Sequence, residues 1–409
     1  MTDLDSGPRD WATEFDHTHE DYAAAAPEIW DELRQRCPVA HSPAHGGVWL
    51  PTRHADVSAV ANDTTRFSSE GIIVNRFKPS GLAPMGYAPP ITSDPPFHSD
   101  ARRLLLPAFA PRQIERWEEA TRQTCRELIR DLLEEAGPDG VVDAATGYAQ
   151  HIPVRVIAEM LGLPREDGDR FRTFIHRILE KPGEYTDSIA PEDTLVHYLS
   201  EVIRSRRREP PRDDLIGFLL SAEMDGRPLT DEHIFGSIAL LLVAGIDTTW
   251  SAIGASIWHL AQHPEDRRRL REDPSVLPFA IEEFLRFYAP VTMARIVAEG
   301  VDDAAIGDCP VASRDWVLLT FPAANRDPEA FEDADRFVID RQRNRHLAFG
   351  LGIHRCLGSN LARMELTVAV QEWLSAVEEF ELSDPTGVRW STGQVRGPRE
   401  LPVRILREI

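Results

Sequence analysis

The sequence has very few lysines and lacks the basic surface of a nucleic-acid-binding protein. Lys78 and Lys181 are its only lysines, and its formal net charge is −22. Nonspecific binding to DNA or RNA needs clustered basic side chains that contact phosphates. Attraction to anionic membranes needs similar clusters. We therefore expect neither a nucleic-acid partner nor a membrane partner.

Cysteine is also scarce. Cys37, Cys125, Cys309 and Cys356 show neither a Cys-x-x-Cys spacing nor a zinc-type pattern, so we expect no disulfide framework and no zinc knuckle. The segment Met1–Asp21 is acidic and has no apolar stretch of signal-peptide type. No uninterrupted run of 18 apolar residues occurs. These absences predict a reduced, cytoplasmic setting without a membrane anchor.

The chain is long enough to bury a large core, with 409 residues of which 42% are hydrophobic. Length alone would suggest two or three domains. The chemically informative segments, however, are spread along the chain and would have to meet in one site. We therefore predict a polar tail at 1–21 and one large domain at 22–409.

The most informative segment is Phe349–Gly358, with the sequence Phe-Gly-Leu-Gly-Ile-His-Arg-Cys-Leu-Gly. Gly350 and Gly352 permit backbone angles that side chains disfavour. The residues after Cys356 are apolar at helical spacing, which places the thiol near a helix N-terminus. The helix dipole should lower the pKa of that thiol. A thiolate there could ligate haem iron, whereas a lone cysteine would otherwise pack as a small hydrophobe.

A long apolar helix is predicted over Thr230–Gln262. About thirty residues give about 50 Å of helix, enough to cross the domain. Within it, Ala244–Thr249 has the sequence Ala-Gly-Ile-Asp-Thr-Thr. Thr248 could bond back to the carbonyl four residues earlier and open the helix. Asp247 would be costly to bury unless it is paired or used; for an isolated residue, pairing with an arginine is the simpler interpretation.

Residues 71–96 are rich in glycine and proline, so regular structure is not expected there. Long apolar loops are usually functional, and this one could be a lid over a pocket or a loop that covers the core. The next segment has His98 and Arg102 on one helical face. The pair could bind carboxylates or form a solvated face. Glu283 and Arg286 similarly match an ordinary ion pair between residues three apart.

The pattern Phe-x-x-Gly-x-His-x-Cys-x-Gly at 349–358 resembles the cysteine-ligand loop of the cytochrome P450 family, the haem-thiolate monooxygenases. Ala-Gly-x-Asp-Thr-Thr resembles the oxygen-activation segment of that family, and the segments follow in the family order. The resemblance implies a mainly helical fold with small β-sheets around a long central helix. It also implies heme b (iron protoporphyrin IX) with Cys356 as the axial ligand to the metal.

Roles for further residues follow from the same resemblance. Thr248 would hydrogen-bond the reacting oxygen, and Asp247 would relay protons from solvent. Glu283, Arg286 and Arg336 would form a structural triad, although the proline that often precedes the third member is absent. The implied haem contacts, including the propionate donors, are Phe349, Gly350, His98, Arg102, Arg295 and His354.

The substrate contacts that we expect come from the loop, the central helix and the segment that begins at Pro290. They predict a pocket for a small to medium apolar molecule, aromatic or not. The residues are Ile72, Ile73, Val74, Met85, Leu240, Leu241, Ala244, Val291 and Met293.

Electrons must come from a partner, because the sequence has no flavin or nicotinamide fingerprint. A ferredoxin or a reductase, fused or separate, is expected; the tail at 390–398 resembles haem domains that are fused to reductases. The predicted activity is hydroxylation or oxidative dealkylation with O2. A peroxide-driven peroxygenase and a non-catalytic haem sensor or carrier are the alternatives.

Overall fold

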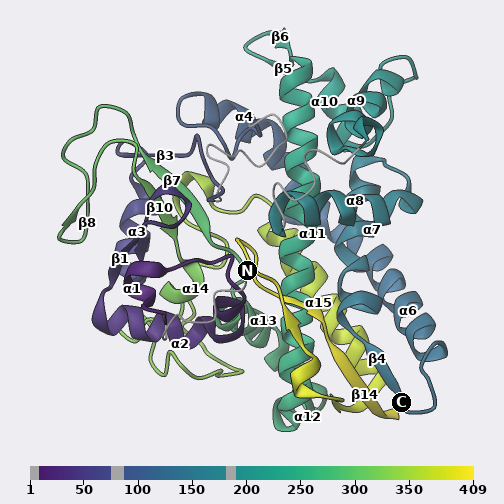
Figure 1. The fold of residues 1–409 in the computed structure, drawn as a ribbon. Helices are drawn as coiled ribbons and strands as arrows, with labels where there is room; N and C mark the ends of the chain where they lie inside the picture. The colour runs from purple at the N-terminus through teal and green to yellow at the C-terminus, as the bar shows by residue number, and fades with distance from the viewer. Residues whose placement is uncertain (1–8, 75–86, 181–189) are drawn as a thin grey trace.

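Helices dominate the computed structural model, which describes residues 9–74, 87–180 and 190–409 (Figure 1). This agrees with the mainly helical class expected from the sequence. In chain order the α-helices are α1 Trp11–Glu14, α2 Glu20–Arg36, α3 His54–Asn62, α4 Phe97–Leu105, α5 Pro111–Ile114, α6 Glu118–Glu134, α7 His151–Leu161, α8 Gly168–Ile175, α9 Leu195–Arg206, α10 Leu215–Ser221, α11 Asp231–Gln262, α12 Pro264–Glu272, α13 Leu277–Phe287, α14 Phe321–Ala324 and α15 Ser359–Ala376.

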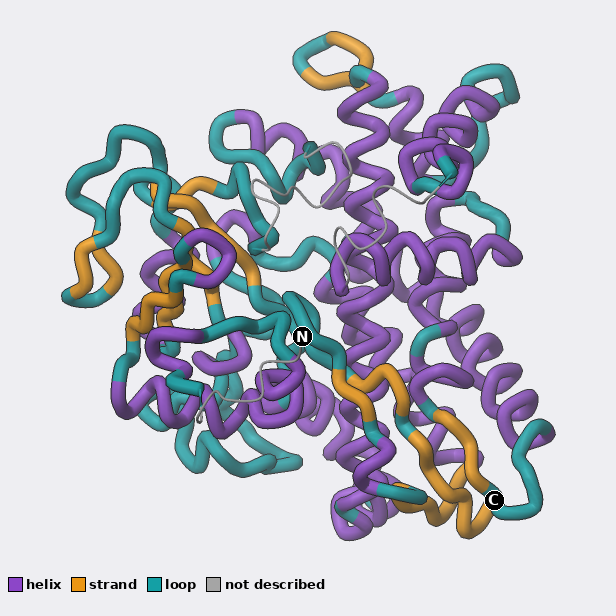
Figure 2. The backbone as a smooth tube through the Cα atoms, in the orientation of Figure 1, coloured by secondary structure: helices purple, strands orange, loops and turns teal. Residues whose placement is uncertain are grey.

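Short strands form small sheets, shown in orange in Figure 2. The largest sheet has the order β1-β2-β10-β7-β3, and a second has the order β11-β14-β4. The strands are β1 Val39–Ser42, β2 Val48–Pro51, β3 Phe67–Ser68, β4 Val141–Asp143, β5 Glu223–Met224, β6 Arg227–Pro228, β7 Met293–Val297, β8 Ala305–Ile306, β9 Cys309–Pro310, β10 Trp316–Leu319, β11 Val377–Leu382, β12 Arg389–Trp390, β13 Pro398–Glu400 and β14 Pro402–Glu408.

The helix predicted over Thr230–Gln262 is present as α11, which runs through the helical half of the molecule (Figure 1). The Thr230 hydroxyl caps it by accepting from the N–H of His233 at 3.1 Å. It ends where Pro264 starts α12, since proline cannot continue a helix. By length and composition α11 could cross a membrane, but 72% of its most apolar window is buried inside the protein. It is a core helix.

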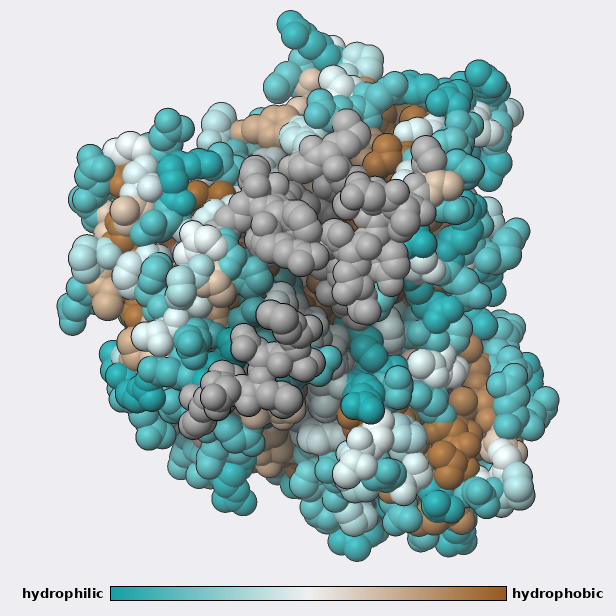
Figure 3. Space-filling view, in the orientation of Figure 1, coloured by the Kyte–Doolittle hydropathy of each residue, from teal (hydrophilic) through white to brown (hydrophobic). Residues whose placement is uncertain are grey.

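The core lies on both sides of α11. The N-terminal half of α11 shares a buried apolar cluster with α7 and α8. The C-terminal half shares another with α6, α13 and α15. The five-stranded sheet lies on the other side of the molecule, with α1, α2 and α3 beside it (Figure 1). Most of the face in Figure 3 is hydrophilic, in keeping with the high charge of the chain. The site described below lies between α11, α15 and β7.

The N-terminal segment differs from the expected polar tail. Residues 1–8 lie outside the described part of the chain, but α1 begins at Trp11 and is followed by buried side chains. Phe15 and Tyr22 are 1% and 2% exposed and pack edge to face, with ring centroids 5.1 Å apart. The Ser42 hydroxyl of β1 donates to the carbonyl of Phe15 at 2.7 Å. Scattered aromatic residues anchor this segment, although its average composition is polar.

Two glycines of α11 test how closely other segments pack against this helix. A Cβ on Gly236 would clash with the carbonyl oxygen of Tyr87 and lie 2.9 Å from Cδ of Pro89. A Cβ on Gly254 would lie at an ordinary 3.4 Å from Pro398. We expect Gly236→Ala to destabilise the protein by about 1–3 kcal/mol through overpacking. Gly254→Ala should be neutral or stabilise it by up to about 1 kcal/mol, because alanine favours the helix.

The measurement is the midpoint of urea unfolding for the two variants and the unaltered protein. Equal midpoints for the two variants would show that the 87–89 segment does not pack on α11 as described.

Candidate active site

The Phe349–Gly358 loop turns so that its thiol faces a cavity at the start of α15. The N–H of Cys356 donates to the carbonyl of Phe349 at 2.7 Å. Gly350 and Gly352 have φ of +64° and +62°, angles that side chains rarely adopt. A Cβ on Gly352 would also lie 3.0 Å from a backbone carbonyl of α3. Both glycines are therefore needed for this turn.

The expected low pKa of the cysteine is wrong for the polypeptide alone. The side chain is open to the cavity but lies deep in the protein. Burial raises the pKa of the Cys356 thiol; the N–H of Gly358 and the guanidinium groups of Arg102 and Arg355 oppose this rise without cancelling it. Desolvation thus exceeds the effect of the helix start. A metal that coordinates a thiol deprotonates it outright, so the site remains compatible with a thiolate ligand.

Four basic or donor side chains gather on one side of the cavity. Arg102, Arg295 and His354 border it, and His98 packs on His354 with ring centroids 4.4 Å apart. Among the described residues, the two guanidinium groups donate to backbone carbonyls, at 2.6 and 2.8 Å. Burial, followed by the neighbouring cations, lowers the pKa of His354 to about 2, and burial lowers that of Arg295 to about 10. These four residues, called the cation cluster below, are suited to bind an anionic group.

The residues that line the cavity are compatible with a flat macrocycle that carries carboxylates. The buried ring of His98 interacts with the backbone of Ile353, and at least one of its nitrogens is left without a partner among the described residues. A Cβ on Gly358 would meet nothing nearer than Phe109, at 4.0 Å. The space beside the Cys356 thiol is therefore open, and donors for two carboxylates stand at its edge. The residues present therefore fit haem.

Thr248 and Asp247 occupy different environments in α11. Thr248 borders the cavity, and its hydroxyl donates to the carbonyl of Ala244 at 2.9 Å. Asp247 is 0% exposed, and its Oδ1 accepts from Nη2 of Arg399 at 2.7 Å. The backbone is helical throughout, so the expected opening of the helix is not seen. The ion pair with Arg399 offsets the cost of burying the carboxylate one residue from the cavity threonine.

The wall opposite the cysteine is apolar. Among the described residues that line the cavity, the charged side chains are all in the cation cluster and none is on this wall. The predicted substrate contacts that border it are Ile73, Leu240, Leu241, Ala244, Val291 and Met293. Lining residues that the sequence patterns did not identify include Ile91, Leu179, Gln394 and Val395.

Two predicted substrate contacts among the described residues, Ile72 and Val74, are not on this wall. Met85 lies outside the described residues. Ile72 and Val74 are 0% and 1% exposed, and they do not border the cavity; Val74 packs in the N-terminal cluster with Trp30. The segment is extended, so alternate side chains point to opposite sides. Only Ile73 therefore reaches the cavity.

Gln394 holds that extended segment in place. With its amide oriented to satisfy both partners, it donates to the carbonyl of Ile72 at 3.2 Å and accepts from the N–H of Val74 at 2.7 Å. The backbone carbonyl of Gln394 accepts from the N–H of Thr292 at 2.9 Å. Local sequence patterns gave no signal for this residue, because its side-chain partners are about 320 residues earlier in the chain.

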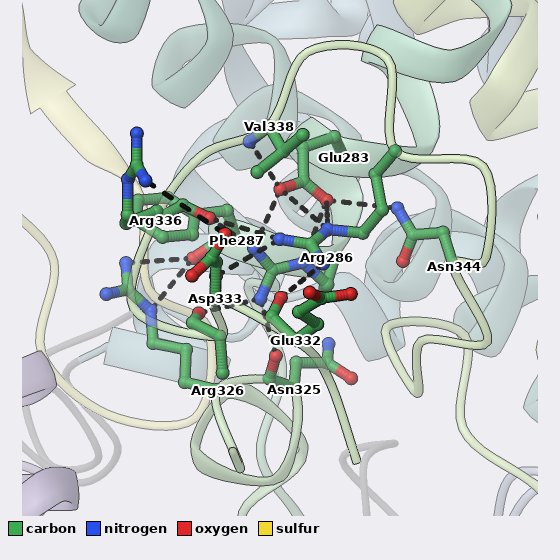
Figure 4. A network of polar contacts seen from close by, with 12 residues as sticks. Glu283, Arg286, Phe287, Asn325, Arg326, Glu332, Asp333, Arg336, Val338 and Asn344 are labelled. Carbon is green, nitrogen blue, oxygen red and sulfur yellow. Dashed lines mark hydrogen bonds and ion pairs between the residues drawn. The ribbon is translucent and has the colours of Figure 1, made fainter.

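A buried carboxylate braces the loop on the cysteine side (Figure 4). Glu283 is 0% exposed and pairs with Arg286 through two hydrogen bonds of 2.7 and 2.8 Å. It also accepts from the N–H of Val338 at 2.8 Å and from Nδ2 of Asn344 at 3.1 Å. Arg286 in turn donates to the carbonyl of Asn325 at 2.8 Å. These bonds join α13 to the segment that leads to the cysteine loop.

The third arginine of this network is not the predicted one. The Arg336 side chain is 72% exposed and points away, and only its carbonyl accepts from Arg286, at 2.7 Å. The Arg341 side chain is 9% exposed, and its Nε lies 3.0 Å from a carboxylate oxygen of Glu283. The segment between them turns back, which brings the later arginine to the carboxylate. The structural triad is Glu283, Arg286 and Arg341.

The chain is similar to proteins of one family over most of its length. The model of the family described as Cytochrome P450 matches residues 168–392. "Mycinamicin IV hydroxylase/epoxidase" of Micromonospora griseorubida is 36% identical over 91% of this chain and 94% of its own. "Vitamin D(3) 25-hydroxylase" of Pseudonocardia autotrophica is 36% identical over 88% of each.

Solved structures agree with these sequence similarities. A crystal structure of CYP109E1 from Bacillus megaterium in complex with testosterone superimposes with a TM-score of 0.83. It is 30% identical and covers 95% of this chain and 100% of that one. Cytochrome P450 CYP109Q5 from Chondromyces apiculatus gives the same TM-score at 32% identity, covering 96% and 98%.

The two arginines beside Glu283 provide a matched test of the bracing network. Arg341→Ala should lower the free energy of unfolding by about 2 kcal/mol, because it leaves a buried carboxylate with one charged partner fewer. Arg336→Ala should change it by less than about 0.5 kcal/mol, as for an exposed side chain. Urea unfolding of both variants measures the difference. A larger effect at Arg336 would restore the arrangement expected from the sequence.

Proposed function

The chain belongs to the cytochrome P450 family of haem-thiolate monooxygenases, and from this we propose that it inserts one atom of O2 into an apolar organic substrate. The observation that carries the proposal is one cavity bordered by a loop thiol, a cation cluster and a helix hydroxyl. Cys356 would be the axial ligand of heme b. When bound, the haem supplies the oxygen chemistry, and its thiolate ligand donates electron density that favours O–O cleavage.

The cation cluster would position this cofactor. We assign Arg102, Arg295, His98 and His354 to the propionates, because these side chains bring hydrogen-bond donors to one edge of the cavity. Charge-assisted hydrogen bonds to carboxylates are among the strongest that proteins form. Phe349 and Gly350 also border the cavity and would pack against the macrocycle on the cysteine side.

The polar segment of α11 would deliver protons. We assign Thr248 to donating a hydrogen bond to the reacting oxygen, which requires its hydroxyl to turn away from the carbonyl of Ala244. Asp247 would exchange protons with solvent at the position of its partner Arg399, whose side chain is 13% exposed. A carboxylate held one residue from a cavity hydroxyl is suited to general acid–base work.

The wall composition supports a neutral apolar substrate of small to medium size, aromatic or not. Ile73, Leu240, Leu241, Val291 and Met293 present hydrocarbon and thioether surface toward the cavity. A charged substrate would lose its hydration there without a partner. The names of the relatives include hydroxylases, which supports hydroxylation as the reaction type. Oxidative dealkylation would follow when the attacked carbon bears a heteroatom.

The family implies an external source of electrons, and we propose a ferredoxin with its reductase, separate or fused, in the cytoplasm. No described cysteine is in a disulfide, as is usual for a reducing compartment.

Spectroscopy and turnover together test this proposal. The purified protein should contain haem, and its reduced carbon monoxide complex should show the strongly red-shifted band of a thiolate ligand. Cys356→Ser should lose that band. With NADPH and a surrogate ferredoxin and reductase, an apolar substrate panel should yield oxygenated products.

The alternatives predict other results in the same assay. A sensor or carrier would show the band without product, and a peroxygenase would form product efficiently only with hydrogen peroxide. Retention of the red-shifted band in Cys356→Ser would refute the assignment of the ligand.

The hydroxyl of Thr248 provides a second test. Thr248→Ala should reduce product formed per NADPH consumed by about 10- to 100-fold, because a positioned proton donor typically contributes at least this much. Thr248→Ser keeps a hydroxyl and should retain most of the coupling. Product and NADPH are measured in the same reaction. Equal coupling in the alanine variant and the unaltered enzyme would remove Thr248 from the proton path.

A further inference from the structure

Two histidines and an aspartate meet outside the haem cavity, where the N-terminal segment crosses the first β-hairpin. Asp16 and His17 lie between α1 and α2, and His45 lies in the turn between β1 and β2. One ligand atom from each side chain lies within 4.8 Å of the other two. The histidine rings have centroids 5.3 Å apart. None of the three borders the haem cavity.

The contacts within this cluster leave one side chain unused. Oδ1 of Asp16 accepts from Nε2 of His45 at 2.9 Å, and from the N–H and hydroxyl of Thr18 at 2.9 and 2.6 Å. His17 is 1% exposed, and its ring interacts with the backbone of Val74. Neither ring nitrogen bonds Asp16 or His45, so at least one nitrogen is left without a partner among the described residues. Buried polar atoms are rarely left in this state. A metal ion that accepts the lone pair of a ring nitrogen would give His17 a partner.

The backbone at His45 is a separate indication. Its φ is +55°, a left-handed conformation that is uncommon for residues other than glycine. The two following residues, Gly46 and Gly47, also have positive φ. Strained positions of this kind concentrate where a side chain is needed in a fixed place. Here the strain directs the imidazole of His45 at Asp16.

The donor set favours a late first-row divalent cation. Imidazole nitrogen and carboxylate oxygen are common Zn²⁺ ligands, and three protein ligands with one water complete a tetrahedron. Mg²⁺ and Ca²⁺ instead prefer oxygen donors throughout.

We propose that Asp16, His17 and His45 bind Zn²⁺. The ion would replace the proton shared by Asp16 and His45 and take a lone pair from His17. Asp16 would keep its hydrogen bonds from Thr18, which orient the carboxylate as partners of metal ligands usually do.

The position of the site suggests that the ion is structural. The carbonyl of His17 accepts from the N–H of Gly393 at 2.8 Å. The next residue, Gln394, bonds the extended segment that brings Ile73 to the cavity. An ion at His17 would therefore fix the N-terminal segment where it supports the substrate wall.

A second group, His259, His263 and Asp266, also brings three potential ligands together. There His259 already bonds the Tyr288 hydroxyl at 2.7 Å and Asp266 at 3.0 Å. Both of its nitrogens are satisfied, so this group serves as the control.

Zinc binding to the haem-containing protein tests the proposal. The protein is treated with EDTA, titrated with Zn²⁺ by calorimetry, and analysed for metal after dialysis. We expect about one zinc per chain, with affinity reduced at least about 100-fold in Asp16→Asn and His45→Asn. Loss of a ligand should cost no less than loss of a supporting residue, which costs 10- to 100-fold. Asparagine suits the left-handed backbone at position 45.

His263→Ala should bind zinc as the unaltered protein does. Far-UV circular dichroism and the haem spectrum show whether each variant is folded, and His17→Gln replaces any variant that is not. The proposal is overturned if the unaltered chain binds no stoichiometric zinc, if affinity persists in the Asp16 and His45 variants, or if it is lost in His263→Ala.

Discussion

The carboxylate of Glu283 is the constraint on which the cysteine side of the site depends. It is fully buried and receives hydrogen bonds from Arg286, Val338, Arg341 and Asn344. A buried charge with one partner is expensive, but a carboxylate whose lone pairs are all engaged is not. Because the donors come from a long irregular segment, the requirement to satisfy this one group gives that segment a single path. The cysteine loop follows that path.

The opposite wall of the cavity has no such centre. It is assembled from the extended segment at Ile73, from α11, from the start of β7 and from the tail at Val395. Backbone and amide contacts of Gln394 join the extended segment, the tail and the start of β7, and the ion pair of Asp247 with Arg399 joins the tail to α11. The ligand side is thus fixed by an ionic network, whereas the substrate side can change with single apolar substitutions. This division suits a fold that keeps one cofactor chemistry and accepts varied substrates.

The parts of the site that could be predicted from the sequence are those carried by short motifs that resemble segments of the cytochrome P450 family. The turn at Cys356, the long helix with Thr248 and the cation at Arg102 each depend on residues a few positions apart. The exchange of Arg336 for Arg341 could not be foreseen, because it depends on how an irregular segment folds back onto Glu283. The pKa direction of the thiol was likewise wrong, since sequence shows a helix start but not the burial around it.

The C-terminal tail shows why this limit matters for function. Arg399 pairs with Asp247, while Gln394, five residues earlier, holds the substrate wall. The tail lies close to α11 at Gly397, where any Cβ would collide with the side chain of Ser251. One short segment therefore sets both the charge balance beside the proposed proton path and the shape of the pocket. Since these two properties share a scaffold, a change in the tail that reshapes the pocket also disturbs the aspartate.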